Sequence, residues 1–450
     1  MWGLIMYSDK DVIVAAATSQ QVKAPLSVIR VSGEGCWAIL KDGFRSRFNS
    51  SLKPWQMRYG DWLDEDGVVD DVMVVVYRGP KSYTGQDMFE LTAHGNPVLV
   101  EAIVRDVVRR GARRARPGEF TMRAVLNGKM GLLEAEGVSA LIESNTRYQA
   151  DLARRQAKGP LVGRVREYVE EILQIQAHIE ATIDYGEEDV DALERDSLVR
   201  RIGVLVDSVA KVRDTGLFAR GMRRGFRVLI TGEPNVGKST LFNTLVKNER
   251  AIVTHLPGTT RDLISEEIEI DGLPVVLVDS AGVRDTDDVV ESLGIEKIFE
   301  MLEDVDLVLY LAVNGDQKPP YDKILELPKE KWITIGTKLD VSVSAVDGFD
   351  VVLSAVTGEG VEELEKEVVN RLTDVMKGQS VYLINERQSD VMEAVTVCLQ
   401  QAWSDFKDGF GEEVLSSYLN TARSLLGELT GETTVEDILD RMFSNFCLGK

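Results

Sequence analysis

A glycine-rich run at residues 232–239 constrains this chain more than any other part of its sequence. It reads Gly-Glu-Pro-Asn-Val-Gly-Lys-Ser and matches the pattern G-x-x-x-x-G-K-[ST] in full. An apolar segment at 226–230 precedes it and a segment with helical character follows from Thr240, which is the strand–loop–helix context that the pattern requires. In such a loop, backbone N–H groups and the helix N-terminus surround phosphate oxygens. Because Lys238 suits the β- and γ-phosphates and Ser239 suits Mg²⁺, the sequence predicts a nucleoside triphosphate site.

Four later motifs indicate which nucleotide is bound. They are Pro-Gly-Thr-Thr-Arg-Asp at 257–262, Asp-Ser-Ala-Gly at 279–282, Thr-Lys-Leu-Asp at 337–340, and the pair Ser354 and Ala355. In order and spacing they resemble the nucleotide motifs of the translation-factor-like GTPases. Asp340 carries the choice of base, because its carboxylate can accept hydrogen bonds from guanine N1–H and N2–H₂, and adenine offers no such pair. GTP is therefore the expected nucleotide.

The predicted GTP site draws on all five motifs. Thr260 is expected to reach Mg²⁺ opposite Ser239, and the backbone N–H of Gly282 to meet the γ-phosphate. Thr337 stands where the translation-factor-like GTPases usually have Asn. That Asn makes two contacts, one to the guanine edge and one to the phosphate loop, and Thr337 can make at most one of them. Ser280, in place of the usual Thr, is a milder change. The full predicted set is Asn235, Val236, Gly237, Lys238, Ser239, Thr240, Thr254, Leu256, Thr259, Thr260, Asp279, Ser280, Ala281, Gly282, Thr337, Lys338, Asp340, Ser354 and Ala355.

The hydrolytic residues are predicted from a substitution after Gly282. Many signalling GTPases have a water-orienting Gln there, but this chain has Val283, which cannot polarise water. Glu291 is the best candidate for that role, although composition alone reads the acidic run 285–291 equally well as a solvated loop. A resemblance to potassium-dependent GTPases implies that Asn235, with Thr254, Leu256 and Thr259, holds K⁺ beside the phosphates.

The length of the chain and its pattern of β-rich and helical segments predict several domains, of the α/β and α+β classes. At 450 residues it is too long for one core. Short β-rich runs at 12–17, 26–31, 68–77 and 89–93 predict an α+β N-terminal domain, and apolar residues at helical spacing predict helices on both sides of the nucleotide motifs. We therefore expect a P-loop GTPase domain inserted in a helical domain. The predicted segments are 1–118 (N-terminal domain), 119–220 (first helical part), 221–377 (GTPase) and 378–450 (second helical part).

The charge of the chain limits how it can bind nucleic acid. A net charge of −22 argues against RNA binding over the whole surface, because counter-ion release needs clustered lysines and arginines. Local basic runs occur at 105–116, with six arginines, and at 220–227, with four. Each is most simply read as a solvated helix face. Any RNA contact is therefore expected to be local or shared with a more basic partner.

Cysteine usage and hydropathy indicate the compartment. The three cysteines lie far apart without paired spacing, which predicts neither a disulfide framework nor a zinc site. No apolar run approaches the ~20 residues of a membrane span, and the start of the chain lacks a signal pattern. A cytoplasmic protein with no membrane contact is expected.

Further motifs outside the GTPase core carry a family resemblance. They are Ser-Val-Ile-Arg-Val-Ser-Gly at 27–33, Tyr-Thr-Gly-Gln-Asp at 83–87, Glu-Leu-Thr-Ala-His-Gly at 90–95, Ala-Arg-Pro-Gly-Glu-Phe-Thr at 115–121 and the terminal Phe-Cys-Leu-Gly-Lys. In this order they resemble the MnmE (TrmE) family of tRNA-modification GTPases over essentially the whole chain. The final Cys-x-Gly-Lys is a specific marker, because a generic GTPase has no reason to end that way.

The resemblance implies an activity, cofactors and partners. It implies a homodimer whose N-terminal domains pair and bind tetrahydrofolate, in the 5,10-methylene or 5-formyl form. The folate would supply a one-carbon unit to C5 of the wobble uridine (U34) of tRNA. The FAD-dependent protein MnmG (GidA) would work with it in a heterotetramer or larger complex, using NADH and glycine or ammonium to install a (carboxymethyl)aminomethyl group.

The resemblance also implies a folate site at Arg30, Glu90, Lys129 and Lys450. Glu90 offers a bidentate acceptor for pterin N–H groups, and Arg30 and the lysines suit carboxylates or ring oxygens. Cys447 is either a nucleophile towards the uracil ring or a packed, inert residue. The loop at 18–25 departs from the family by lacking glycine.

A second hypothesis belongs to another class. It is a regulatory GTPase that binds the ribosome or its precursors and modifies nothing. Such relatives usually carry a basic or GXXG-type RNA-binding appendage, which this acidic sequence does not show. The folate-type motifs and the Cys-x-Gly-Lys end favour the modification enzyme, and folate binding would discriminate between the two.

Overall fold

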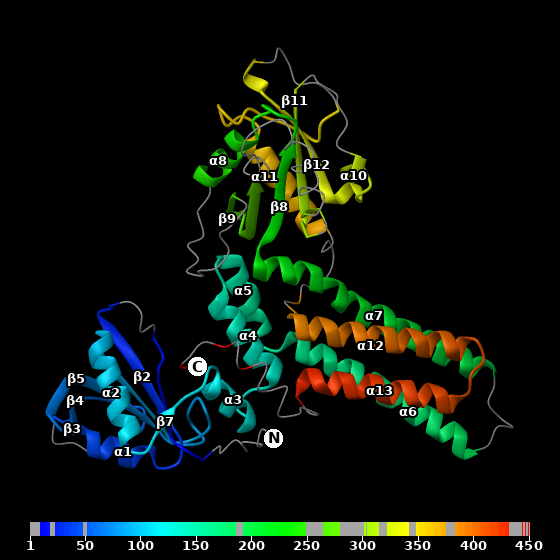
Figure 1. Cartoon of the computed structure of the whole chain (residues 1–450). Coiled ribbons are helices and arrows are strands. Elements are labelled where there is room, and N and C mark those ends of the chain that lie inside the picture. The colour runs from blue at the N-terminus through cyan, green and yellow to red at the C-terminus, as the bar shows by residue number, and fades with distance from the viewer. Residues whose placement is uncertain are drawn as a thin grey trace, which may run out of the picture. The chain divides into compact units, whose positions relative to one another are not determined.

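The structure, a computed structural model, divides the chain into two compact units that are described separately (Figure 1). Unit 1 is Met1–Ser139 with Thr430–Lys450, and unit 2 is Ala140–Leu429. The structure describes residues 10–18, 23–47, 52–185, 192–248, 264–279, 301–302, 304–314, 322–341, 348–374, 382, 384–431, 443, 446 and 449.

Unit 1 is built on a seven-stranded sheet. In sheet order its strands are β3 (Phe44–Ser46), β4 (Met57–Asp64), β5 (Gly67–Tyr77), β6 (Met88–His94), β2 (Leu26–Ser32), β1 (Ile13–Ala16) and β7 (Arg113–Arg114). Neighbours are antiparallel except β1 and β7. Every second residue of β5 from Val72 to Val76 is buried, as the period of a strand requires when one face meets a core. That core is completed by α1 (Cys36–Gly43) and α2 (Pro97–Arg109).

The chain end returns to unit 1. Phe443 and Phe446 pack with residues of α3 (Glu119–Leu126) and α4 (Leu132–Glu143) in a small apolar cluster. Gly449 lies against β1 with a φ of +93°, and a Cβ there would come within 2.3 Å of the Ala16 carbonyl oxygen. Only glycine fits this approach, which explains the glycine of the terminal motif.

Unit 2 contains a six-stranded sheet in the order β13 (Val351–Val352), β12 (Trp332–Thr337), β11 (Leu307–Val313), β8 (Phe226–Gly232), β10 (Leu273–Asp279) and β9 (Ile264–Ile270). Neighbours are parallel except β9, which is antiparallel to β10. The strands β8 and β11 are almost entirely buried, because a parallel sheet is covered on both faces. The other elements here are α8 (Lys238–Asn248), α10 (Asp322–Leu325), η2 (Lys329–Lys331), η3 (Leu339–Val341) and α11 (Val361–Thr373).

Long helices form the rest of unit 2. They are α6 (Pro160–Tyr185), α7 (Ala192–Arg224), α12 (Glu386–Lys407) and α13 (Glu412–Thr430), preceded by the shorter α5 (Arg147–Gln156). Hydrogen bonds join them pairwise: Tyr168 of α6 donates to the Ser208 carbonyl of α7 at 2.8 Å, and Trp403 of α12 donates to the Val199 carbonyl of α7 at 3.1 Å. The sequence places Val165, Val169, Ile172, Ile175 and Ile179 at helical spacing. In α6 all of them are buried except Val169, which is half-buried.

The order of elements confirms the predicted fold class. The phosphate-loop domain begins at β8, directly after α7, and is followed by α12, so it is inserted between helices of one bundle. The residue boundaries given for the four predicted segments stay predictions. Among the described residues, none of the helices has the length and apolar character needed to cross a membrane.

Replacing Gly449 with Ala is expected to loosen the docking of the chain end. The left-handed φ and the Cβ clash with the Ala16 carbonyl together cost on the order of 1–3 kcal/mol. Hydrogen–deuterium exchange of the C-terminal peptide should therefore be about tenfold faster or more. Gly411→Ala is the matched control, because a Cβ there meets no atom within 4 Å. Equal exchange in both variants would contradict the docking geometry.

Candidate functional site

The phosphate loop lies at the carboxyl end of β8. Gly232 has a φ of +142°, and a Cβ there would lie 2.2 Å from the Leu311 carbonyl oxygen of the neighbouring strand. Lys238, the first residue of α8, donates from Nζ to the carbonyls of Gly232 at 3.0 Å and Glu233 at 2.7 Å. Its side chain thus curls over the loop and holds positive charge where phosphates are expected. Asn235 has a φ of +60°, a conformation that Asn adopts more readily than most residues.

A hydroxyl and a carboxylate meet beside this loop. Ser239 Oγ donates to Oδ2 of Asp279 at 3.1 Å. Asp279 ends β10 and is buried. Ser239 lies in the first turn of α8, which follows the loop after the adjacent parallel strand β8. Open α/β sheets place their ligands at this edge. These are the oxygen donors that Mg²⁺ prefers.

The predicted base-recognition residues also come together. Ser354 Oγ donates to Oδ1 of Asp340 at 2.7 Å, which orients an otherwise exposed carboxylate. The N–H of Leu339 donates to the Leu353 carbonyl at 3.2 Å and so joins the two loops. The hydroxyl of Thr244, on α8, lies 2.9 Å from the Ala355 carbonyl oxygen, with the Thr240 carbonyl at 2.9 Å as an alternative acceptor. Sequence reasoning did not single out Thr244, because only the folded α8 brings its hydroxyl to this loop.

Thr337 links the base-recognition loop to the phosphate loop. Its buried hydroxyl donates to the Val236 carbonyl at 2.7 Å, with the Ala312 carbonyl at 3.1 Å as an alternative acceptor. Of the two contacts expected of the usual Asn, Thr337 thus makes the one to the phosphate loop.

Some predicted site residues lie outside the described residues. They are Thr254, Leu256, Thr259, Thr260, Ser280, Ala281, Gly282, Glu291, Cys447 and Lys450. Their roles stay predictions.

A second candidate site lies on the sheet of unit 1. Arg30 on β2 and Glu90 on β6 are register partners, and Nε of Arg30 donates to Oε1 of Glu90 at 2.8 Å. Tyr77 donates to the other carboxylate oxygen at 3.1 Å. Burial, and then the Glu90 charge, raise the pKa of Tyr77 to about 12, so this phenol stays a donor at neutral pH.

Aromatic rings and the chain end complete the surroundings of Arg30. Its guanidinium carbon lies 4.9 Å from the ring centroid of Tyr83 and 5.6 Å from that of Phe120. Nη1 of Arg30 also approaches the Gly449 carbonyl, at 3.5 Å. Lys129, from the predicted set, donates to the Pro80 carbonyl at 3.0 Å in the loop that carries Tyr83. The structure therefore gathers two of the predicted residues directly and adds Tyr77 and Tyr83, which spacing alone did not reveal.

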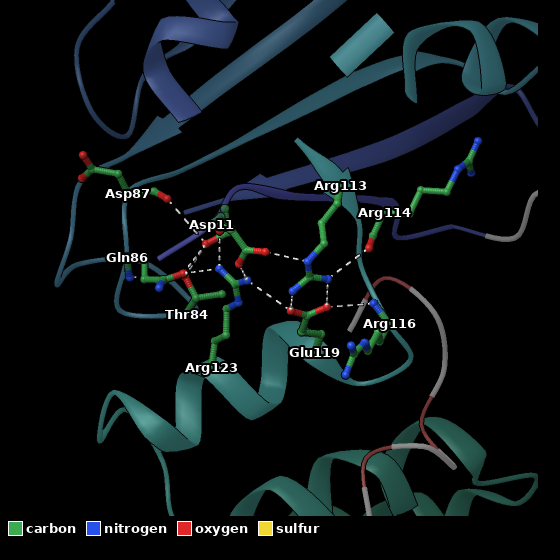
Figure 2. Close-up of polar contacts among 10 residues, drawn as sticks. Asp11, Thr84, Gln86, Asp87, Arg113, Arg114, Arg116, Glu119 and Arg123 are labelled. Carbon is green, nitrogen blue, oxygen red and sulfur yellow. Dashed lines mark hydrogen bonds and ion pairs between the residues drawn. The ribbon is translucent and has the colours of Figure 1, made fainter. Parts of the chain in front are cut away.

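A network of ion pairs supports the loop that carries Tyr83 (Figure 2). Nη2 of Arg123, a fully buried side chain, lies 2.5 Å from Asp11 Oδ1 and 3.1 Å from Glu119 Oε1. Nη1 of Arg123 donates to Gln86 Oε1 at 3.2 Å, at the end of that loop. Arg113 forms a second ion pair with Glu119 at 2.5 Å. The network thus connects α3, β7 and the start of β1 to the loop.

Hydrogen bonds and positive charges stabilise the buried Glu119 as a carboxylate. Burial by itself raises its pKa, but the hydrogen bonds from Arg113 and the Arg116 N–H, with the charges of Arg113 and Arg123, outweigh it. The pKa of Glu119 is therefore lowered.

The nucleotide site and the fold together define a class. Phosphate loop and guanine-type base loop stand at one edge of a mostly parallel sheet, as in P-loop GTPases, and the chain is a member of that class. Two family models match it: the MnmE helical domain over residues 132–447 and the GTP-binding protein TrmE N-terminus over residues 12–129. The chain therefore belongs to the MnmE (TrmE) family, which confirms the resemblance drawn from its motifs.

Individual relatives match over nearly the full length. The tRNA modification GTPase MnmE of Thermotoga petrophila is 40% identical over 459 residues, covering 98% of this chain and 100% of that protein. That of Aquifex aeolicus is 36% identical over 450 residues, with coverage of 98% and 100%. Among solved structures, the G domain of the T. maritima FeoB iron transporter is 27% identical over 32% of this chain and 98% of that one, with a TM-score of 0.22.

Thr337→Val is expected to weaken GTP binding. Valine keeps the shape but leaves the buried Val236 carbonyl without its donor, a loss of about 1–3 kcal/mol. The affinity for a fluorescent GTP analogue should fall about tenfold. Thr421→Val removes an equivalent hydroxyl, which donates to the Ser417 carbonyl in α13, and should change nothing. Identical affinities would contradict the linking role of Thr337.

Acid is expected to destabilise unit 1 through Glu119. A lowered pKa contributes stability that is complete above the unfolded value, near 4.5, and is lost as pH falls through the folded value. Glu119→Gln should cost about 3 kcal/mol at neutral pH by breaking a buried pair, and should flatten the loss of stability below pH ~4.5. Urea unfolding of the wild type and of Glu119→Gln, at neutral pH and at the acid pH, measures the free energy of unfolding of each protein. If the variant lost as much stability in acid as the wild type does, the role of Glu119 would be refuted.

Proposed function

We propose that this chain is the GTP-hydrolysing component of a complex that modifies C5 of the wobble uridine (U34) of tRNA with a tetrahydrofolate one-carbon unit. The name of its relatives, tRNA modification GTPase, supports the substrate class. A second site in the same chain, unrelated to the nucleotide site, supports a second chemistry. The observation that carries the proposal is the Arg30–Glu90 pair, flanked by aromatic rings and by Gly449 of the terminal motif.

The described residues fit GTP and Mg²⁺. Lys238 lies over the phosphate loop, and Ser239 and Asp279 offer adjacent oxygen donors. When bound, Mg²⁺ supplies positive charge at the phosphates. Asp340, held by Ser354, selects guanine. Thr260 is proposed to complete the magnesium site.

Hydrolysis is proposed to need Glu291 and a monovalent cation. Glu291 would orient the attacking water, since Val283 cannot. Asn235, with Thr254, Leu256 and Thr259, would hold K⁺ in place of an arginine finger. The left-handed backbone at Asn235 supports a special role for this position.

The donor set of unit 1 fits a pterin. Glu90 accepts hydrogen bonds, Arg30 donates them, and the rings of Tyr83 and Phe120 offer apolar faces near a planar ligand. Lys129 and Lys450 are proposed to bind the glutamate tail or ring oxygens. The bound folate would supply the one-carbon unit.

The proposed partners follow from the family. We propose a cytoplasmic homodimer that works with the FAD-dependent MnmG (GidA) to install a (carboxymethyl)aminomethyl group, with glycine or ammonium as the amine donor. Cys447 is proposed as a residue near the reaction, either nucleophilic or packed.

Mass spectrometry of tRNA nucleosides tests the proposal. Cells without the chain should lose a 5-substituted wobble uridine. Glu90→Gln should lower this nucleoside and folate binding while GTP turnover stays unchanged, because Glu90 and the nucleotide site lie in different units. Glu101→Gln, which removes a carboxylate paired with Arg114 in the same unit, is the control.

An unchanged nucleoside profile without the chain would overturn the proposal. Together with an absence of folate binding, it would favour the regulatory, ribosome-associated GTPase.

A further inference from the structure

Of the two basic runs singled out in the sequence, the first is largely neutralised in the structure and the second is neutralised in part. Of the six arginines at 105–116, five form ion pairs with carboxylates: Arg105, Arg109, Arg110, Arg113 and Arg114. In the second run, Arg224 pairs with Asp304 and Asp306, and Arg227 pairs with Asp304. Cations already paired have little to gain from a polyanion, so the paired arginines of these runs are poor contacts for a nucleic acid.

A different segment keeps its charge exposed. Arg155, Lys158 and Arg166, called here the basic corner, lie around the turn from α5 to α6 and are exposed. Within the part of the chain that the structure describes, no carboxylate lies within ion-pair distance of any of the three. Arg154 and Arg164, beside them, are exposed but pair with Asp151 and Glu167. The corner is thus a concentration of available cations in a chain of net charge −22.

The packing of α5 determines which way this charge faces. Thr146, Gln149, Ala153 and Gln156 form its buried side, so Arg155 projects from the opposite, solvent side. The N–H of Lys158 donates to the Arg155 carbonyl at 3.1 Å, which keeps the two residues adjacent.

The other end of α5 is less suited to an anion. Thr146 there donates to the Gly272 carbonyl at 2.8 Å, which brings the β9–β10 turn and its Asp271 beside that end. Glu266, Glu267 and Glu269 on β9 add negative charge to the same hairpin. The exposed Arg147 at that end therefore has carboxylates of the hairpin nearby, and the α5–α6 turn is the more favourable of the two ends for a polyanion.

We propose that the basic corner docks the phosphate backbone of tRNA. This inference rests on the proposed function and adds to it the surface that holds the substrate. Phosphate contacts position a nucleic acid without reading its sequence, so the corner would orient tRNA and leave the choice of uridine to other groups. An ordinary role for these cations, complementing the C-terminal dipole of α5, predicts a small loss of stability and no effect on RNA.

The test measures binding of an unmodified tRNA transcript to the full chain at about 50 to about 200 mM salt. The double variant Arg155→Gln/Lys158→Gln should bind roughly ten- to thirtyfold more weakly at physiological salt, and the slope of log K against log salt should shrink by about 1.8. Lys211→Gln/Lys366→Gln removes the same charge from exposed positions on α7 and α11 and should match the wild type. GTP turnover should be unchanged in both.

Three outcomes would overturn the inference. One is equal affinity and salt slope in the double variant and the wild type, with or without a lower Tm. Another is wild-type binding to heparin but not to tRNA, which would indicate a different polyanionic partner. The third is no binding of the transcript by the wild type. The nucleoside profile of cells tests the proposed function independently of tRNA binding. The proposed function and the docking role of the basic corner can therefore be refuted separately.

Discussion

The parallel pairing of β8 with β10 and β11 is the constraint on which the nucleotide site depends. Parallel strands bring their carboxyl ends to one edge of the sheet. Gly232, Asp279 and Thr337 each end a parallel strand of this sheet. Gly232 begins the phosphate loop, Asp279 accepts a hydrogen bond from Ser239 directly after that loop, and Thr337 donates one to Val236 within it. The register also packs Gly232 against Leu311 so closely that no side chain fits. The phosphate loop is therefore shaped as much by the neighbouring strand as by its own residues.

Unit 1 uses a different principle, in which charges are kept inside by mutual pairing. Arg123 and Glu119 are both almost fully buried. Arg123 is paired with Glu119 and Asp11, and Glu119 is paired with Arg123 and Arg113, so that neither charge is buried alone. The network ends at Gln86, in the loop that brings Tyr83 to Arg30. A polar core of this kind favours one arrangement of the loop over others, because a partly formed network leaves charges unpaired. The candidate folate site thus has a rigid support.

Charge pairing also changes how the acidic composition is understood. The net charge of the chain is −22, but its carboxylates do not repel nucleic acid uniformly, because many of them form ion pairs with nearby arginines. Asp106 holds Arg109 and Arg110, and also accepts a hydrogen bond from Trp62 at 3.0 Å. The cations left available are few and local. Density of arginine in the sequence is therefore a poor guide to a binding surface in this protein.

The sequence by itself determined the phosphate loop, the position of Asp340 as the predicted base-recognition residue, most strands of the unit 1 sheet and the insertion of the GTPase between helices. These features depend on contiguous residues, or on the spacing of apolar residues along one element. Such local patterns can be recognised directly in the amino-acid sequence. The tertiary structure alone decided that Tyr77 would hold Glu90, that Thr244 would reach the Ala355 loop, and which arginines would be neutralised. It also showed why Gly449 must be glycine. Those contacts join residues that are distant in the chain, and sheet register and helix packing, which no short motif encodes, set the distances between them.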